Sequence, residues 1–115
     1  MPYVILGQET NLSTEPFLKD GKHYVPLREV VQALGGTVSY DNATKTATAT
    51  ISPWVATVTP NTTAVDVSGK AVTLTAPTFI EDDVLYVPYD FFYNAYGYEV
   101  TFKEGTVTIV NPNAR

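Results

Sequence analysis

The triplet Tyr-Val-Pro occurs twice in this chain, and the sequence around the two copies matches. Tyr24-Val25-Pro26 and Tyr86-Val87-Pro88 start 62 residues apart. Four other residues recur at the same spacing: Asp20, Ala33, Gly35 and Val38 match Asp82, Ala95, Gly97 and Val100. A long internal match predicts that one supersecondary unit is used twice. We therefore expect a single domain, residues 1–115, made of repeat 1 (about 3–51) and repeat 2 (about 54–110).

Each triplet is followed by a pattern typical of a short amphipathic helix. Apolar residues at i, i+3, i+4 and i+7 form a stripe on one face of a helix. In repeat 1 this stripe is Leu27, Val30, Val31 and Leu34, and in repeat 2 it is Tyr89, Phe92, Tyr93 and Tyr96. The pattern predicts helices over 26–34 and 88–96 that start at proline and end at glycine, with both stripes facing the core.

Short strands account for most of the remaining chain. Threonine is abundant, with 17 residues, and it alternates with apolar residues in segments such as Thr46–Ile51 and Trp54–Thr59. Alternation with a period of two predicts strands that are buried on one face. We count about ten strands and two short helices, arranged as hairpin, helix and hairpin in each repeat. The predicted fold class is α+β with mainly antiparallel sheets.

The composition excludes several functional classes. The net charge of −5 and the pI of about 4.6 argue against a nucleic-acid partner. There is no cysteine, which excludes disulfides and thiolate chemistry. No apolar run approaches the length of a membrane span. No charged and apolar leader begins the chain, so we expect that any signal peptide has been removed.

The region around the first triplet resembles a known family. The stretch from Asp20 to Val30, centred on Tyr-Val-Pro-Leu-Arg, and the following Ala33-Leu34-Gly35-Gly36 are similar to the copper amine oxidase N-terminal-like domain. The resemblance covers nearly the whole chain, but repeat 2 has Tyr89-Asp90-Phe91 in place of Leu27-Arg28-Glu29. It implies an exported module of bacterial secreted or cell-surface proteins, without established catalysis of its own.

The residues themselves do not suggest an enzyme. His23 is the only histidine, whereas a copper site built from imidazoles needs several. A nucleophile also needs a base and an orienting acid, and one strand histidine does not provide them. The acidic run Glu81-Asp82-Asp83 is predicted to be a solvated hairpin turn, with weak calcium binding as the alternative. We expect no catalytic residues, no cofactor and no metal.

Aromatic residues suggest a contact surface. Eight of the 17 residues from Tyr86 to Phe102 are aromatic. Phe91 lies where repeat 1 has Glu29, on the helix face expected to meet water, and Tyr98 lies where repeat 1 has Gly36. Together with Trp54, they are the candidate residues for binding a protein or a cell-wall glycan. The alternative is that the two halves pack against each other there.

The N-terminal segment is a candidate for self-association. Tyr3, Val4, Ile5 and Leu6 form a strand with no charge or proline to protect an open edge. Such a strand either adds to the sheet of a neighbouring molecule or pairs within its own chain.

The functional hypothesis is a non-catalytic structural or protein-interaction module of the bacterial cell envelope. Its expected partners are proteins or copies of itself, with self-assembly into a surface filament or array. The alternative is a cell-wall glycan-binding module.

Overall fold

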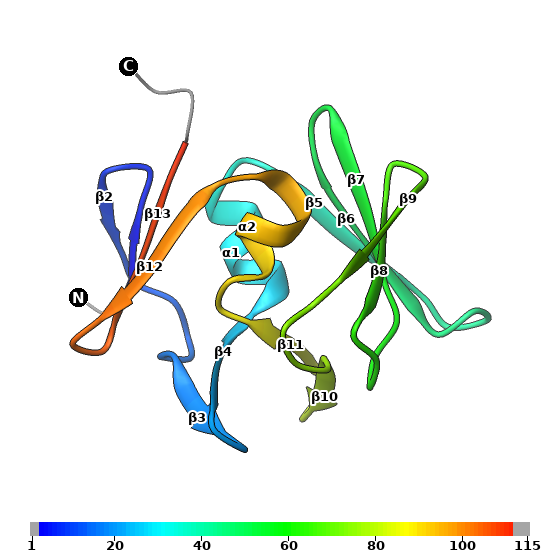
Figure 1. The fold of residues 1–115 in the computed structure, drawn as a ribbon, viewed down its shortest axis with the longest axis horizontal. Coiled ribbons are helices and arrows are strands. Elements are labelled where there is room, and N and C mark those ends of the chain that lie inside the picture. The colour runs from blue at the N-terminus through cyan, green and yellow to red at the C-terminus, as the bar shows by residue number, and fades with distance from the viewer. Residues whose placement is uncertain (1–2, 112–115) are drawn as a thin grey trace.

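The computed structural model describes residues 3–111, which form three sheets and two short helices (Figure 1). The fold class is α+β, as predicted, and all but one of the strand pairs in these residues are antiparallel. In chain order the elements are β1 (Tyr3–Ile5), β2 (Gln8–Thr10), β3 (Phe17–Lys19), β4 (Lys22–Pro26), α1 (Leu27–Ala33), β5 (Thr37–Asp41), β6 (Thr46–Ile51), β7 (Trp54–Val58), β8 (Ala64–Val67), β9 (Lys70–Thr73), β10 (Phe79–Glu81), β11 (Val84–Pro88), α2 (Phe91–Tyr96), β12 (Glu99–Lys103) and β13 (Thr106–Val110).

The two Tyr-Val-Pro triplets pair with each other at the centre of the sheet β10-β11-β4-β3. Tyr24-Val25-Pro26 and Tyr86-Val87-Pro88 are antiparallel, so the two valines are opposite each other and each tyrosine faces the other triplet's proline. The Tyr89 N–H donates to the His23 carbonyl at 3.0 Å, which places the Tyr24–Pro88 pair at a position without ladder hydrogen bonds. Proline has no N–H to donate, so it fits this register at no cost.

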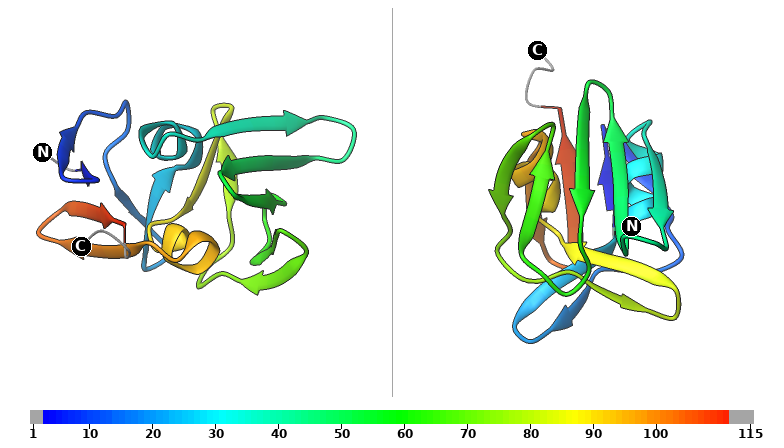
Figure 2. Two further views of the ribbon diagram at one scale, coloured as in Figure 1. Left: turned by 90° about the horizontal axis from the view of Figure 1, so that it is seen from above. Right: turned by 90° about the vertical axis from the view of Figure 1, so that its right-hand side faces the viewer.

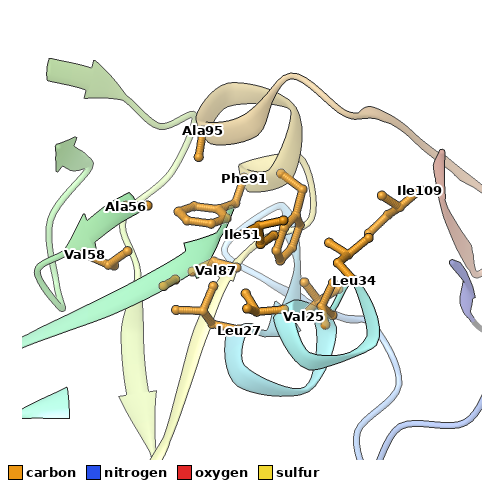
Figure 3. Close-up of a cluster of buried hydrophobic side chains, with 14 of the residues drawn as sticks. Val25, Leu27, Leu34, Ile51, Ala56, Val58, Val87, Phe91, Ala95 and Ile109 are labelled. Carbon is orange, nitrogen blue, oxygen red and sulfur yellow. The ribbon is translucent and has the colours of Figure 1, made fainter. Parts of the chain in front are cut away.

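The other two sheets enclose the helices. The order is β12-β13-β1-β2 on one side and β5-β6-β7-β8-β9 on the other. Figure 2 shows α1 and α2 between these sheets in the view from above. The main core lies where the three sheets and both helices meet, and Val25, Val87, Leu27 and Phe91 are completely buried in it (Figure 3).

The second helix is shorter than predicted, and its inward face differs. Pro88 ends β11, and α2 begins three residues later, at Phe91, although it ends at Gly97 as expected. The predictions that Tyr93 packs inward and that Phe91 faces water are therefore wrong. Phe91 is 0% exposed and Tyr93 is 61% exposed.

The physical cause of this shift lies at Asp90. Its carboxylate accepts hydrogen bonds from Lys22 at 3.1 Å and from the Thr75 hydroxyl at 3.0 Å. These contacts hold Asp90 before the first residue of the helix. The helix then turns Phe91 and Phe92 into the core, and the phenol of Tyr93 stays in solvent.

The N-terminal strand is not an open edge. β1 pairs in parallel with β13 and antiparallel with β2, and Tyr3 and Ile5 are buried. Leu6 belongs to the turn between β1 and β2, where its φ is 53°. The prediction that residues 3–6 present an unprotected strand to other molecules is thus wrong. The sequence pattern also missed β2, whose short polar sequence has no strand signature.

A second, smaller core lies on the other face of the central sheet. Phe17, Tyr24, Phe79 and Tyr86 pack edge to face and stacked, with ring centroids 4.8 Å apart for Tyr24 and Phe79 and 5.0 Å apart for Phe17 and Tyr86. The two phenylalanines and the two tyrosines are each 62 residues apart, so both hairpins contribute the same pair of rings. Alternation along each strand thus sends the valines to the main core and the tyrosines to this cluster.

The two tyrosines of this cluster differ in one hydrogen bond. The Tyr24 hydroxyl donates to the Pro77 carbonyl at 2.8 Å, whereas the Tyr86 hydroxyl makes no such bond in residues 3–111. We expect Tyr24→Phe to lower the free energy of unfolding by about 1 kcal/mol. The matched Tyr86→Phe change should be close to neutral. Urea denaturation of both variants measures the difference, and equal losses would contradict the assignment.

A close approach between α1 and β6 requires glycine at position 36. A Cβ at Gly36 would lie 2.2 Å from the Thr50 carbonyl oxygen and 2.8 Å from Ile51. We expect Gly36→Ala to lower the free energy of unfolding by about 3 kcal/mol, at the upper end of the usual cost of overpacking. Gln32→Ala, at an exposed position of α1, is the control and should change it by less than about 0.5 kcal/mol. Urea midpoints report both values. If the Gly36→Ala protein is as stable as the control, the backbone around position 36 shifts to accommodate the added Cβ.

Candidate functional site

A hollow lies between the start of α1 and the β10–β11 hairpin. Its volume is about 440 Å³. We call it the α1 groove. Apolar side chains form most of its wall, and charged and amide side chains form its rim. Its lining includes Leu27, Val38, Tyr40, Ile80, Val84 and Leu85, with Arg28, Glu29, Asn42 and Asp83.

Aromatic rings are found at the positions 62 residues from two residues of this groove. The residues 62 positions from Tyr40 and Leu85 are Phe102 and His23, and their rings are in contact, with centroids 4.1 Å apart and planes tilted by 32°. Phe102 also contacts the ring of Tyr89, at 5.6 Å between centroids. In the α1 groove the aliphatic Leu85 stands at the position 62 residues from His23, and Tyr40 remains 37% exposed. Rings therefore fill the space beside Phe102, whereas the space beside Tyr40 is open.

Backbone contacts fix the two charged residues on the α1 side of the groove. The Arg28 guanidinium donates to the Val38 carbonyl at 2.8 Å. The Glu29 carboxylate accepts the Ser13 N–H at 2.7 Å and also a short hydrogen bond from the Ser13 hydroxyl. Side chains held in this way lose little conformational freedom when a ligand binds. The α1 side of the rim is therefore preorganised.

A smaller hollow contains one of the predicted contact residues. It has a volume of about 300 Å³ and lies between α2 and strands β7 to β9. Trp54, which is 48% exposed, lines it together with Val67, Ser68, Lys70, Val72, Asn94, Ala95 and Tyr96. We call it the Trp54 groove. The Nδ2 atom of Asn94 is buried and has no hydrogen-bond partner in the described residues.

The three predicted contact residues do not form one surface. Phe91 is in the core, so it cannot contact a partner. Tyr98 is half-buried, with its ring centroid 6.4 Å from that of Tyr96, and it is not part of the Trp54 groove. Trp54 alone is exposed as expected. The sequence pattern did not identify Asn94, because nothing in its local sequence indicates that its amide is left without a partner.

The acidic segment Glu81-Asp82-Asp83 is exposed, as predicted: Glu81 ends β10, and Asp82 and Asp83 form the turn to β11. Within residues 3–111, no three histidine, cysteine or acidic side chains gather in the way a metal site requires. No helix in the same residues combines the length and apolar character needed to cross a bilayer.

These features define a small β-rich module with two central helices and two surface grooves of different composition. The chain belongs to the copper amine oxidase N-terminal domain family, whose sequence profile matches residues 4–111. In copper amine oxidases this domain is an accessory, non-catalytic part of the protein. No curated protein matches the chain.

Burial raises the pKa of four tyrosines, of which Tyr96 lines the Trp54 groove: Tyr3, Tyr24, Tyr96 and Tyr98. The folded state thus holds these phenolic protons more tightly than the unfolded state, whose tyrosine pKa is 10.0. Their contribution to stability is complete below pH 10 and is lost as the pH rises through the raised values.

We expect the melting temperature to fall steeply above about pH 10. Tyr98→Phe, which removes no hydrogen bond present in the structure, should make this fall shallower and leave the melting temperature near pH 7 almost unchanged. Thermal denaturation by circular dichroism, together with tyrosinate absorbance, measures both effects. Complete ionisation of all tyrosines in the folded protein near the ordinary pKa would contradict the expectation.

Proposed function

We propose that this chain is a non-catalytic interaction module of the bacterial cell envelope, built by duplication of one unit, and that it associates with copies of itself through the α1 groove. The observation that carries the proposal is the contrast between the halves. Rings close the space between β12 and β4, whereas the equivalent space between β5 and β11 stays open and apolar. Exposed apolar surface of this kind marks interaction sites. Membership of a family of accessory domains supports a binding role rather than catalysis.

The proposed occupant is the β3–β4 hairpin of a second copy. Leu18 in this hairpin is 63% exposed, more than any other large hydrophobic side chain in the described residues. The Lys19 ammonium beside it is held 4.1 Å from the centre of the Phe79 ring. Asp83 of the acidic Glu81-Asp82-Asp83 segment lines the groove, together with Glu29 and Arg28. An apolar side chain next to a cation therefore complements an apolar groove beside this acidic segment.

This arrangement joins two different surfaces. A contact in which the donor and acceptor surfaces differ is heterologous, so each copy keeps one free hairpin and one free groove after it binds. Such contacts continue into a filament unless the rotation between copies closes a ring. The chain is therefore expected to assemble into a surface filament or array.

Two variants at exposed positions separate the two surfaces. Leu18→Glu removes the donor side chain and keeps the groove. Ile80→Glu places a charge in the groove beside Asp83 and keeps the donor. We expect wild-type protein to form large species at high concentration and each variant to remain monomeric. An equimolar mixture of the two variants should form dimers and stop there, because only one functional contact is available.

Light scattering coupled to size-exclusion chromatography measures these masses. Tyr93→Glu, a change of an exposed ring that belongs to neither the β3–β4 hairpin nor the α1 groove, is the control and should assemble like the wild type. Wild-type protein that stays monomeric at every concentration would reject self-association. Variants that lose assembly singly but form no dimers when mixed would reject the heterologous contact.

A further inference from the structure

The Trp54 groove contains polar groups that neither the fold nor the proposed self-association uses. Its walls come from three strands and α2, and the α1 groove shares none of its residues. Two of its side chains stand out: the Asn94 amide, which is buried without a partner, and the exposed indole of Trp54. Together they combine a hydrogen-bond donor with an aromatic face.

The unpaired amide of Asn94 lowers the stability of the fold without a compensating contact in the described residues. Burying a donor that forms no hydrogen bond destabilises the fold, and native structures contain few such groups. Asn94 lies in α2 directly before Ala95 and Tyr96, which also line the groove. Asn94 itself lines the groove, and its terminal torsion is soft, so the orientation of the amide is adjustable. A ligand that offers an oxygen there would satisfy it.

The two aromatic walls differ in how firmly they are held. The Tyr96 hydroxyl donates to the Ala49 carbonyl at 2.7 Å, and its ring is stacked on Phe92 with centroids 6.3 Å apart. This wall is therefore rigid. Trp54 makes no ring contact within the described residues and keeps about half its surface in solvent, at 48%. The electron-rich face of an indole attracts the C–H faces of a sugar ring in the same way as it attracts the edges of other rings.

Lys70 adds a positive charge to the Trp54 groove. Lys70 is exposed, and the ion pair found in the described residues, Lys22–Asp90, does not involve it. Ser68 accepts the Val55 N–H at 3.1 Å, so its own hydroxyl proton is available to a ligand. An ammonium in a groove that is also lined by aromatic rings favours a ligand with a carboxylate.

We propose that the Trp54 groove binds a saccharide that carries carboxylates, of the uronic acid class. The Trp54 indole stacks on the C–H face of one sugar ring, the Asn94 amide donates to a ring or hydroxyl oxygen, and the Lys70 ammonium pairs with the carboxylate. A proline-rich peptide also stacks on aromatic rings, but its pyrrolidine rings offer no carboxylate to Lys70.

The chain provides its own reporter, because Trp54 is the only tryptophan. We would titrate the protein with oligogalacturonate, with the same oligosaccharide as its methyl ester, and with a proline-rich peptide. The expected result is a saturable change in tryptophan emission with oligogalacturonate. Affinity for the ester, which lacks the charge, should be about tenfold lower. Raised salt should weaken binding of the acid form only.

Variants test the three contacts separately. Lys70→Gln should reduce affinity for the acid about tenfold and remove the discrimination against the ester, whereas Lys103→Gln, at an exposed position of β12, is the matched control and should bind as the wild type does. Asn94→Leu should weaken binding and at the same time raise the melting temperature, because it removes the orphaned donor. Trp54→Ala, followed by calorimetry, should abolish measurable binding.

Three outcomes would overturn the proposal. The first is no emission change with either oligosaccharide. The second is equal affinity for acid and ester with no effect of Lys70→Gln. The third is a response to the proline-rich peptide alone. Leu18→Glu should bind oligogalacturonate normally, so the result is independent of self-association through the α1 groove.

Discussion

The antiparallel pairing of Tyr24-Val25-Pro26 with Tyr86-Val87-Pro88 fixes the position of every other element. Its register places both valines in the main core and both tyrosines in the aromatic cluster on the opposite face. Each triplet ends in a proline, after which the chain leaves the sheet and enters a helix on the same side. A slip of one residue would exchange the two faces of both strands, so burial of two separate cores holds this register in place.

The residues that follow the two triplets differ, and the surfaces beside them differ as well. Where Leu27-Arg28-Glu29 follows the first triplet, the helix begins at once and the groove beside it stays open. Where Tyr89-Asp90-Phe91 follows the second, the Lys22–Asp90 ion pair delays the helix, and Tyr89 and Phe102 fill the equivalent space. The aromatic residues after the second triplet thus stabilise the fold by packing together. Beside the first triplet, apolar surface remains exposed and available for contact.

Sequence patterns correctly predicted the features that depend on residues close together in the chain. The α+β class, the hairpins and both helix ends at glycine follow from period and turn chemistry. The start of α2 was not predictable in this way, because Asp90 is held by Lys22 and Thr75 from other parts of the chain. The same limit applies to the pairing of β1, whose neighbour β13 is at the opposite end of the sequence. The orphaned amide of Asn94 depends on three-dimensional packing and has no sequence signal.

The two grooves divide the surface between two kinds of contact. The α1 groove is bordered by carboxylates of the β10–β11 turn and suits an apolar side chain beside a cation. The Trp54 groove carries Lys70, a cation on a chain whose net charge is −5, and suits an anion. Opposite local charges disfavour each ligand in the other's groove, because like charges repel across a contact. A chain with this net charge also repels its own copies at long range, so association depends on local complementarity of the kind that Lys19 and the acidic turn provide.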